Sequence, residues 1–102
     1  MIRHIVFFSA RSETDAEAIR DGLAILTRIP HALRLEVSFN RKSDALSKEI
    51  DVVVYGEFAS PEALAAYKAH EIYAESVRLV RPLREIRLAA DYDVSEAVTS
   101  QA

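Results

Sequence analysis

Two histidines and two tyrosines are the residues of this 102-residue chain that could carry acid–base chemistry. His4 lies inside the first apolar run, and Tyr67, His70 and Tyr73 follow one another at intervals of three residues. An imidazole has a reference pKa of about 6.5, so it can give or take a proton near neutral pH. A phenol has a reference pKa of about 10 and serves mainly as a hydrogen-bond donor. These groups suggest a small cavity in which a proton moves to or from a bound ligand.

The spacing of Tyr67 and His70 places both on one face of a helix, if that helix is continuous. Tyr67 could then donate to a ligand oxygen while His70 moves a proton. The alternative is that His70 caps a helix or packs beside a break in it. Tyr73 extends the same stripe into the ligand pocket, although an aromatic stripe at helical spacing is more often part of the core. His31 follows Pro30 in a turn and is expected to face solvent.

His4 shares one face of the first strand with Ile2, Val6 and Phe8, because side chains alternate along a strand. That face is apolar, so the imidazole should point inward. It could act there as a general acid or base. The alternative is a core histidine whose ring is satisfied by a neighbouring phenol or carbonyl group, since buried polar groups are usually paired.

Other kinds of site are not supported by the sequence. Neither His4 nor His70 has another histidine three or four residues further on, and no acidic cluster has ligand spacing, so no metal site is predicted. The chain has no cysteine, which excludes disulfides and thiolate sites. It also lacks phosphate-loop, dinucleotide and nucleophile-elbow motifs, so kinase, dehydrogenase and hydrolase activities are disfavoured and no cofactor is expected.

The charge balance narrows the range of partners. Thirteen basic and 16 acidic residues give a net charge of −3 without a basic stripe, which disfavours nucleic acid and anionic membranes as partners. No apolar run is long enough to cross a membrane, and the N-terminus lacks the layout of a signal peptide. The sequence therefore predicts a soluble, cytoplasmic protein.

The elements that must position these residues follow from periodicity and from helix signals. Thr14 to Glu17 has the pattern of a capping box and is expected to begin a helix that ends near Pro30. Gly22 within it costs about 1 kcal/mol relative to alanine, so a close packing contact is expected there. Ser60 and Pro61 begin a second helix that continues towards Val80. Alternating apolar residues predict strands over residues 33–40 and 84–93. β-branched and aromatic residues predict a strand over residues 2–9, and a more uniformly apolar run predicts one over residues 50–58.

The resulting βαββαβ order is that of a ferredoxin-like α+β sandwich, in which a four-stranded antiparallel sheet carries both helices on one face. The predicted domain covers residues 1–94, and residues 95–102 form a flexible tail. The second face of the sheet has no cover within the chain. Exposing large apolar side chains there would forfeit roughly 1.5–3 kcal/mol each. We therefore expect a homodimer whose sheets pack face to face as a dimeric α/β barrel.

Several segments in this order resemble the stress-responsive dimeric α/β-barrel (Dabb) family. They cover the region of residues 1–94 and are Met1-Ile2-Arg3-His4-Ile5-Val6, Ile29-Pro30, Asp51-Val52-Val53-Val54-Tyr55-Gly56-Glu57-Phe58, Ala65-Ala66-Tyr67-Lys68-Ala69-His70, Arg81-Pro82-Leu83 and Asp91-Tyr92. The resemblance implies a ferredoxin-like subunit, a homodimer and a pocket between sheet and helices. Relatives include an aldol-type polyketide cyclase of plants and stress-associated stabilising proteins, whereas most members have no assigned activity.

One departure from the family pattern bears on chemistry. Members commonly carry His-Pro-x-His after the tyrosine, whereas this chain reads His70-Glu71-Ile72-Tyr73. Tyr73 thus stands where the cyclase has its base, and a phenol is a poor general base at neutral pH. The cyclase reaction is therefore not transferred to this chain.

The sequence leaves three functions open. The first is a homodimeric small-ligand pocket protein, with cofactor-independent proton transfer on a small carbonyl or aromatic compound and with His4, Tyr67 and His70 as catalytic residues. The second is a non-catalytic, stress-associated assembly protein. The third and weakest is a cofactor-free monooxygenase, which depends on fold analogy.

Overall fold

The structure, a computed structural model, describes residues 1–100. Within them the chain forms four strands and three α-helices. In chain order these are β1 (Ile2–Ala10), α1 (Ala16–Ala24), β2 (Arg34–Phe39), β3 (Val52–Phe58), α2 (Pro61–Ala69), α3 (Glu71–Val80) and β4 (Arg84–Asp93). Short 3₁₀ turns lie at Glu13–Asp15 (η1), Ile25–Arg28 (η2) and Val94–Glu96 (η3).

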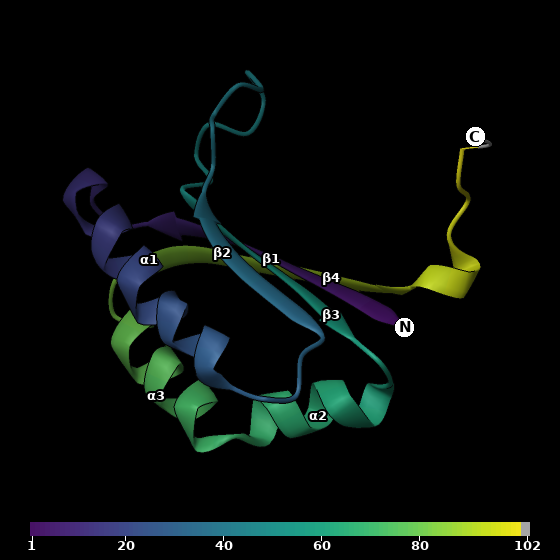
Figure 1. The fold of residues 1–102 in the computed structure, drawn as a ribbon. Helices are drawn as coiled ribbons and strands as arrows, with labels where there is room; N and C mark the ends of the chain where they lie inside the picture. The colour runs from purple at the N-terminus through teal and green to yellow at the C-terminus, as the bar shows by residue number, and fades with distance from the viewer. Residues whose placement is uncertain (101–102) are drawn as a thin grey trace.

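The strands form one antiparallel sheet in the order β2-β3-β1-β4, and the helices lie on one side of it (Figure 1). This confirms the predicted α+β architecture. The two central strands, β1 and β3, are the most apolar, and β4 is paired along one edge only. The order brings residues near the two ends of the chain side by side, because β1 pairs with β4 over almost its whole length.

Strand parity decides which residues reach the core. Val6 and Phe8 of β1 and Val52 and Val54 of β3 point towards the helices and are buried. Phe7, between the two β1 residues, points to the opposite face and is exposed. The core beneath the helices is completed by side chains from α1, η2, α2 and α3, namely Ile19, Leu23, Leu26, Leu64, Tyr67 and Val80.

The start of α1 differs from the prediction. Thr14 does not form a capping box, because residues Glu13–Asp15 form a 3₁₀ turn and α1 begins only at Ala16. The Thr14 hydroxyl instead lies 3.0 Å from the Ser12 hydroxyl. The close contact expected at Gly22 is confirmed, since a Cβ built there would lie 2.9 Å from Cγ2 of Val80. Gly22 therefore lets α1 and α3 pack closely, which offsets its poor helix propensity.

The predicted second helix is also wrong as a single element. It is two helices, α2 and α3, separated at His70, whose backbone is extended with ψ of 144°. The break turns the chain between Ala69 and Glu71, so residues on either side of it no longer follow one helical periodicity.

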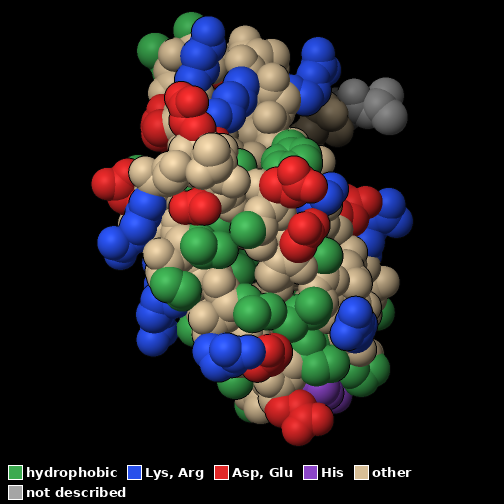
Figure 2. All heavy atoms as spheres, turned by 90° about the vertical axis from the view of Figure 1, so that its left-hand side faces the viewer, with side chains coloured by type: hydrophobic (Ala, Val, Ile, Leu, Met, Phe, Trp, Pro, Cys, Tyr) green, Lys and Arg blue, Asp and Glu red, His purple; other side chains and the backbone are tan. Residues whose placement is uncertain are grey.

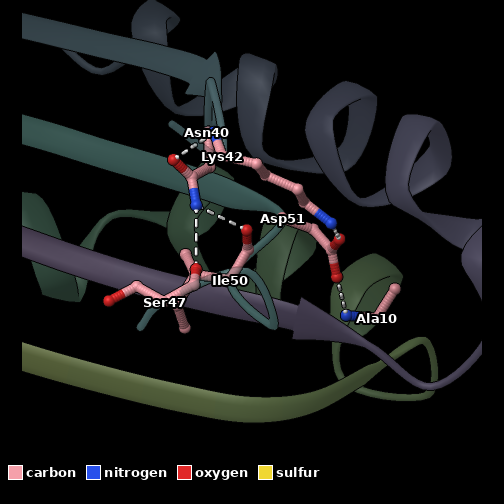
Figure 3. A network of polar contacts seen from close by, with 6 residues as sticks. All are labelled: Ala10, Asn40, Lys42, Ser47, Ile50 and Asp51. Carbon is pink, nitrogen blue, oxygen red and sulfur yellow. Dashed lines mark hydrogen bonds and ion pairs between the residues drawn. The ribbon is translucent and has the colours of Figure 1, made fainter. Parts of the chain in front are cut away.

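The connection between β2 and β3 is held at its base by a polar network (Figure 3). The Asn40 side-chain amide donates to the carbonyl groups of Ser47 and Ile50, at 3.2 and 2.8 Å. Asp51 accepts from the Lys42 ammonium at 2.6 Å and from the Ala10 N–H at 2.8 Å. The base of this loop is therefore tied to the end of β1.

The face of the sheet opposite the helices is uncovered. We call it the open face and define it by the exposed or half-buried side chains of Ile5, Phe7, Val53, Tyr55, Leu88 and Tyr92. The 40–51 loop and the segment after β4 both rise on this side, at opposite ends of the sheet (Figure 1). A hollow of about 270 Å³ lies beside the loop and is lined in part by Phe7, Val53 and Leu88.

The predicted tail, residues 95–102, lies partly outside the described residues, which end at 100. Its first residues belong to η3, and residues 97–100 have no regular structure. Its flexibility stays a prediction. Within residues 1–100, no helix is long and apolar enough to cross a membrane.

Candidate functional site

His4 occupies the centre of the covered face of the sheet. It lies on β1, where it pairs with Gly56 of β3 on one side and with Asp91 of β4 on the other. Its side chain is 1% exposed. Residues paired across antiparallel strands point to the same face, so the carboxyl group of Asp91 lies directly beside the imidazole.

A hydrogen bond joins the two side chains, between Nδ1 of His4 and Oδ1 of Asp91. An ionised carboxylate can only accept, so Nδ1 carries the proton and a neutral imidazole keeps its lone pair on Nε2. Asp91 is 39% exposed and thus remains in contact with solvent. The pair combines an oriented, buried imidazole with a carboxylate that can stabilise the protonated ring.

Tyr67 approaches this pair from α2. Its ring centroid lies 6.3 Å from that of His4 in an edge-on arrangement, and 4.9 Å from that of Phe58. Burial is the main cause that raises the pKa of Tyr67; the nearby Tyr73 adds to the increase and Arg87 opposes it. The phenol therefore stays protonated at neutral pH and can donate a hydrogen bond.

Two polar atoms at this site have no hydrogen-bond partner within residues 1–100, namely the Tyr67 hydroxyl and Nε2 of His4. Over the same residues, the one side-chain nitrogen or oxygen that is both fully enclosed and unpaired is Nε of Arg3. The two site atoms therefore keep a small contact with space that water can enter, although both residues are 1% exposed. Both atoms therefore retain unused hydrogen-bonding capacity.

His70 is not placed beside Tyr67 in the way that the spacing predicts. Because α2 ends at Ala69, His70 caps α3, with Nδ1 accepting from the N–H of Ile72 at 3.1 Å. Its ring packs edge-on against that of His31, at 6.0 Å between centroids. The alternative considered for His70, a cap at a helix break, is therefore the arrangement observed, while a catalytic role for it stays a prediction.

Tyr73, on α3, connects Tyr67 to a cavity of about 240 Å³. Its ring packs edge-on against Tyr67 at 5.3 Å, and it lines the cavity together with the side chains of α1, α3 and β4. The Arg87 guanidinium lies 3.5 Å from its hydroxyl oxygen. Tyr73 thus lines a cavity and its phenol faces a cation, while its role in binding a ligand stays a prediction.

Asp91 is the site residue that the sequence analysis missed. It lies 87 residues from His4, so no local spacing links the two. The available signal was the strand pairing: in a βαββαβ sheet the last strand lies antiparallel to the first, and its polar positions on the covered face become candidates for partners of His4. No group of three histidine, aspartate or glutamate side chains that could hold a metal occurs within residues 1–100.

Comparisons with known proteins place these residues in a family. The model of the stress responsive A/B barrel domain (Dabb) matches residues 2–94. A dimeric ferredoxin-like protein of unknown function from Jannaschia sp. CCS1 has a TM-score of 0.79 and 20% identity, with 91% of this chain and 98% of that chain covered. No protein of curated function matches the chain.

Two other solved structures have the same fold. A Dabb family protein from Mesorhizobium loti has a TM-score of 0.72 and 25% identity, with 90% of this chain and 94% of that chain covered. A Nitrosomonas europaea protein, provisionally named as an antibiotic biosynthesis monooxygenase, has a TM-score of 0.75 and 20% identity, with coverages of 91% and 97%. The fold is therefore ferredoxin-like, and its neighbours include dimers. Because the family model spans almost the whole chain, this protein is a member of the Dabb family of stress-responsive A/B barrel domains.

Proposed function

We propose that this protein is a homodimer that catalyses cofactor-independent proton transfer on a small carbonyl compound, with His4 as the base and Tyr67 as the hydrogen-bond donor. The observation that carries the proposal is the buried His4 imidazole, held by Asp91 through Nδ1 and packed edge-on against Tyr67. An oriented imidazole beside a protonated phenol is a suitable pair for this chemistry.

The proposed step uses both free atoms of the site. Nε2 of His4 takes a proton from the carbon next to the carbonyl group, and the electron pair of that C–H bond moves into the carbonyl to form an enolate. The Tyr67 O–H donates a hydrogen bond to the enolate oxygen, where negative charge develops. The Asp91 carboxylate stabilises the imidazolium, which then returns its proton to the same carbon or to a neighbouring one. No redox partner is consumed.

The homodimer is supported by the open face. Phe7, Leu88 and Tyr92 are large side chains left exposed there, whereas Val6, Phe8, Val52 and Val54 on the other face are buried beneath the helices. Neighbouring structures with this fold from Jannaschia sp. CCS1, Bacteroides fragilis and Thermobifida fusca are dimeric. Packing two open faces together would remove these side chains from water.

Deuterium incorporation tests the catalytic part. Methyl ketones exchange slowly without a catalyst at neutral pH, so the wild-type protein in D₂O should speed the loss of the α-proton NMR signal. General acid–base groups typically contribute about 10²–10⁴-fold, so His4→Gln should abolish most of the acceleration. Asp91→Asn should reduce it, because an amide no longer fixes the proton on Nδ1.

Two controls separate chemistry from folding. His70→Ala should lower stability by about 0.5–2 kcal/mol through loss of a helix cap. Because the cap uses Nδ1 of His70, we expect the exchange rate of the folded protein to stay unchanged, whereas a loss of rate would support the catalytic role predicted from the sequence. His31→Gln should change neither the stability nor the exchange rate. A rate that survives His4→Gln, or that disappears with His70→Ala in protein shown to be folded, would contradict the assignment of His4 as the base.

A second candidate, an assembly protein without catalysis, is favoured by a different observation. The 240 Å³ cavity reaches Tyr73, but neither His4 nor Tyr67 lines it. If no ketone exchanges faster than in buffer and no ligand shifts the His4 ring signals, this candidate replaces the first. Oxygenation is weaker than both, because its support is the Nitrosomonas europaea structure at 20% identity.

A further inference from the structure

The cavity beside Tyr73 has two chemically different walls. One wall is apolar and is formed by Phe8 of β1, Leu23 of α1 and Leu26 of η2. Arg81, Arg84 and Arg87 form the other wall, where α3 ends and β4 begins. A cavity of 240 Å³ lies just below the range of about 300–1,000 Å³ that is usual for drug-sized ligands, so it suits a smaller molecule.

The arginines of this wall have no carboxylate partner in the structure. Within residues 1–100, the ion pairs of arginine are made by Arg20, Arg34 and Arg78, all elsewhere on the molecule. A fourth cation lies next to this wall without lining the cavity, because Nε of Arg11 donates to the carbonyl oxygen of Arg84 at 3.0 Å. Positive charge is therefore gathered without neutralisation around one cavity.

This crowding has an energetic consequence at Arg84. Burial is the main cause that lowers the pKa of its guanidinium, and the charges of Arg87, Arg81 and Arg11 lower it further. Like charges at short range destabilise the fold. A cluster of like charges that lowers stability is expected where a bound ligand of opposite charge reduces the repulsion.

The general charge of the protein does not explain the cluster. Acidic residues outnumber basic ones by 16 to 13, so the chain has enough carboxylates to pair with every arginine and lysine. Both signs are interspersed among hydrophobic side chains on the end of the molecule drawn in Figure 2, without a broad basic field. The cluster is thus local to the cavity.

We propose that this cavity binds a small organic carboxylic acid, with its carboxylate at Arg84 and Arg87 and its apolar body against Phe8, Leu23 and Leu26. Guanidinium groups match carboxylates in geometry and can bind them with two parallel hydrogen bonds. The apolar wall distinguishes an organic acid from inorganic phosphate, which would leave that wall unfilled. The site needs no proton transfer and stands apart from the proposed catalytic function.

Tyr73 completes the polar end of the cavity. Its hydroxyl oxygen faces Arg87, and its own proton remains free to donate to a bound carboxylate. Ser76 cannot donate there, because its hydroxyl already donates to the carbonyl of Gly22 at 2.9 Å. Besides the arginines of the wall, the phenol of Tyr73 is therefore the polar donor that the cavity can offer to a carboxylate.

Calorimetry and protein-observed NMR with hexanoate and hexanamide test the proposal on the wild-type protein. The two probes have the same apolar body and differ in charge. A hydrogen bond to a charged group contributes about 1.5–3 kcal/mol, so hexanoate should bind roughly 10- to 100-fold more tightly than hexanamide. Its shifts should centre on Tyr73, Leu23 and Val77, and its affinity should fall as salt is added.

Variants locate the binding site. Arg84→Gln and Arg87→Gln should each weaken hexanoate about tenfold or more and leave hexanamide unchanged. Arg78→Gln is the matched control, because Arg78 lies on α3 but pairs with Glu75 at the surface. Its hexanoate affinity should stay within about twofold of wild type.

Three results would overturn the proposal. The first is equal affinity for hexanoate and hexanamide, and the second is hexanoate binding that survives both arginine variants. The third is inorganic phosphate displacing hexanoate at equal or lower concentration, which would make the cluster a simple anion site. The wild-type comparison of the two probes decides the matter even if a variant fails to fold. It involves no turnover, so its outcome is independent of the ketone exchange assay.

Discussion

The two faces of the sheet use the same strands for opposite purposes. On the covered face, β1 contributes His4, Val6 and Phe8, all buried beneath the helices. On the open face the same strand contributes Ile5 and Phe7, and Phe7 is 37% exposed. The helices of the same chain cover one face of the sheet. The apolar side chains of the other face have no covering layer within that chain.

The tyrosines of the two faces make the same comparison for polar groups. Burial is the largest cause of the raised pKa of Tyr67 on the covered face. On the open face the pKa of Tyr55 is raised mainly by its hydrogen bond to Glu57, to which it donates at 2.6 Å. The pKa of Tyr67, which has no hydrogen-bond partner in residues 1–100, is thus set mainly by burial. The pKa of Tyr55 is set mainly by its hydrogen bond to Glu57. The phenol without a partner is the one that can serve a ligand.

The largest effect that could break this comparison is expected at Phe7. The wild-type protein should have twice the 11.4 kDa mass of one chain by light scattering at micromolar concentration. Phe7→Asp would place a carboxylate in the interface, where burying an unpaired ion costs several kcal/mol. We expect loss of the dimer and, since folding and assembly are linked, a lower urea midpoint.

Leu79→Asp is the matched control, because Leu79 of α3 is 38% exposed but lies in the helical layer. This variant should remain a dimer. If Phe7→Asp is a dimer with the wild-type midpoint, or if the wild-type protein is a stable monomer, the open face is not an interface between copies.

A smaller effect on the covered face is expected at Gly56, which pairs with both His4 and Leu35. A Cβ at this position would lie 2.7 Å from Cε2 of Phe58 and 3.1 Å from Cδ1 of Leu35. Gly56→Ala should therefore destabilise the protein by about 1–3 kcal/mol through overpacking. Urea unfolding measures the change, and Ser38→Ala on the opposite face should stay within about 0.5 kcal/mol of wild type. An alanine variant as stable as wild type would show that the covered face is loosely packed.

Most of the sheet could be predicted because its signals are local. The alternation over residues 84–93 predicted β4 with the bounds that the structure has, and the alternation around His4 gave its correct face. Parity within a strand is fixed by the backbone, so one reliable strand assignment places every side chain on it. The packing at Gly22 could be predicted for a similar reason, since a glycine inside a helix needs a compensating contact.

The candidate site could be predicted less well, because its geometry depends on single residues and distant pairs. A three-residue interval puts Tyr67 and His70 on one face only while the helix continues, and the extended backbone of His70 ends it. Arg81, Arg84 and Arg87 also recur every third residue, but they run from the end of α3 into β4, where neither period applies. Their convergence on one cavity emerges only from the packing.

The smallest effect sharpens the contrast between the two kinds of tyrosine and concerns alkaline pH. The pKa of Tyr67 is raised in the folded protein by burial, so the folded state holds this proton more tightly than the unfolded state. Its contribution to stability is fully present below the unfolded pKa of about 10 and is lost as pH rises above it. At pH 11, about one unit above that value, the loss is at most about 1.4 kcal/mol.

Tyr67→Phe removes this titration, so the difference in stability between wild type and variant should shift in favour of the variant between pH 8 and pH 11. Urea unfolding of both proteins at the two pH values measures the shift. A gap that is the same at both pH values would mean that Tyr67 ionises freely, and the covered face would then be wetter than its packing indicates.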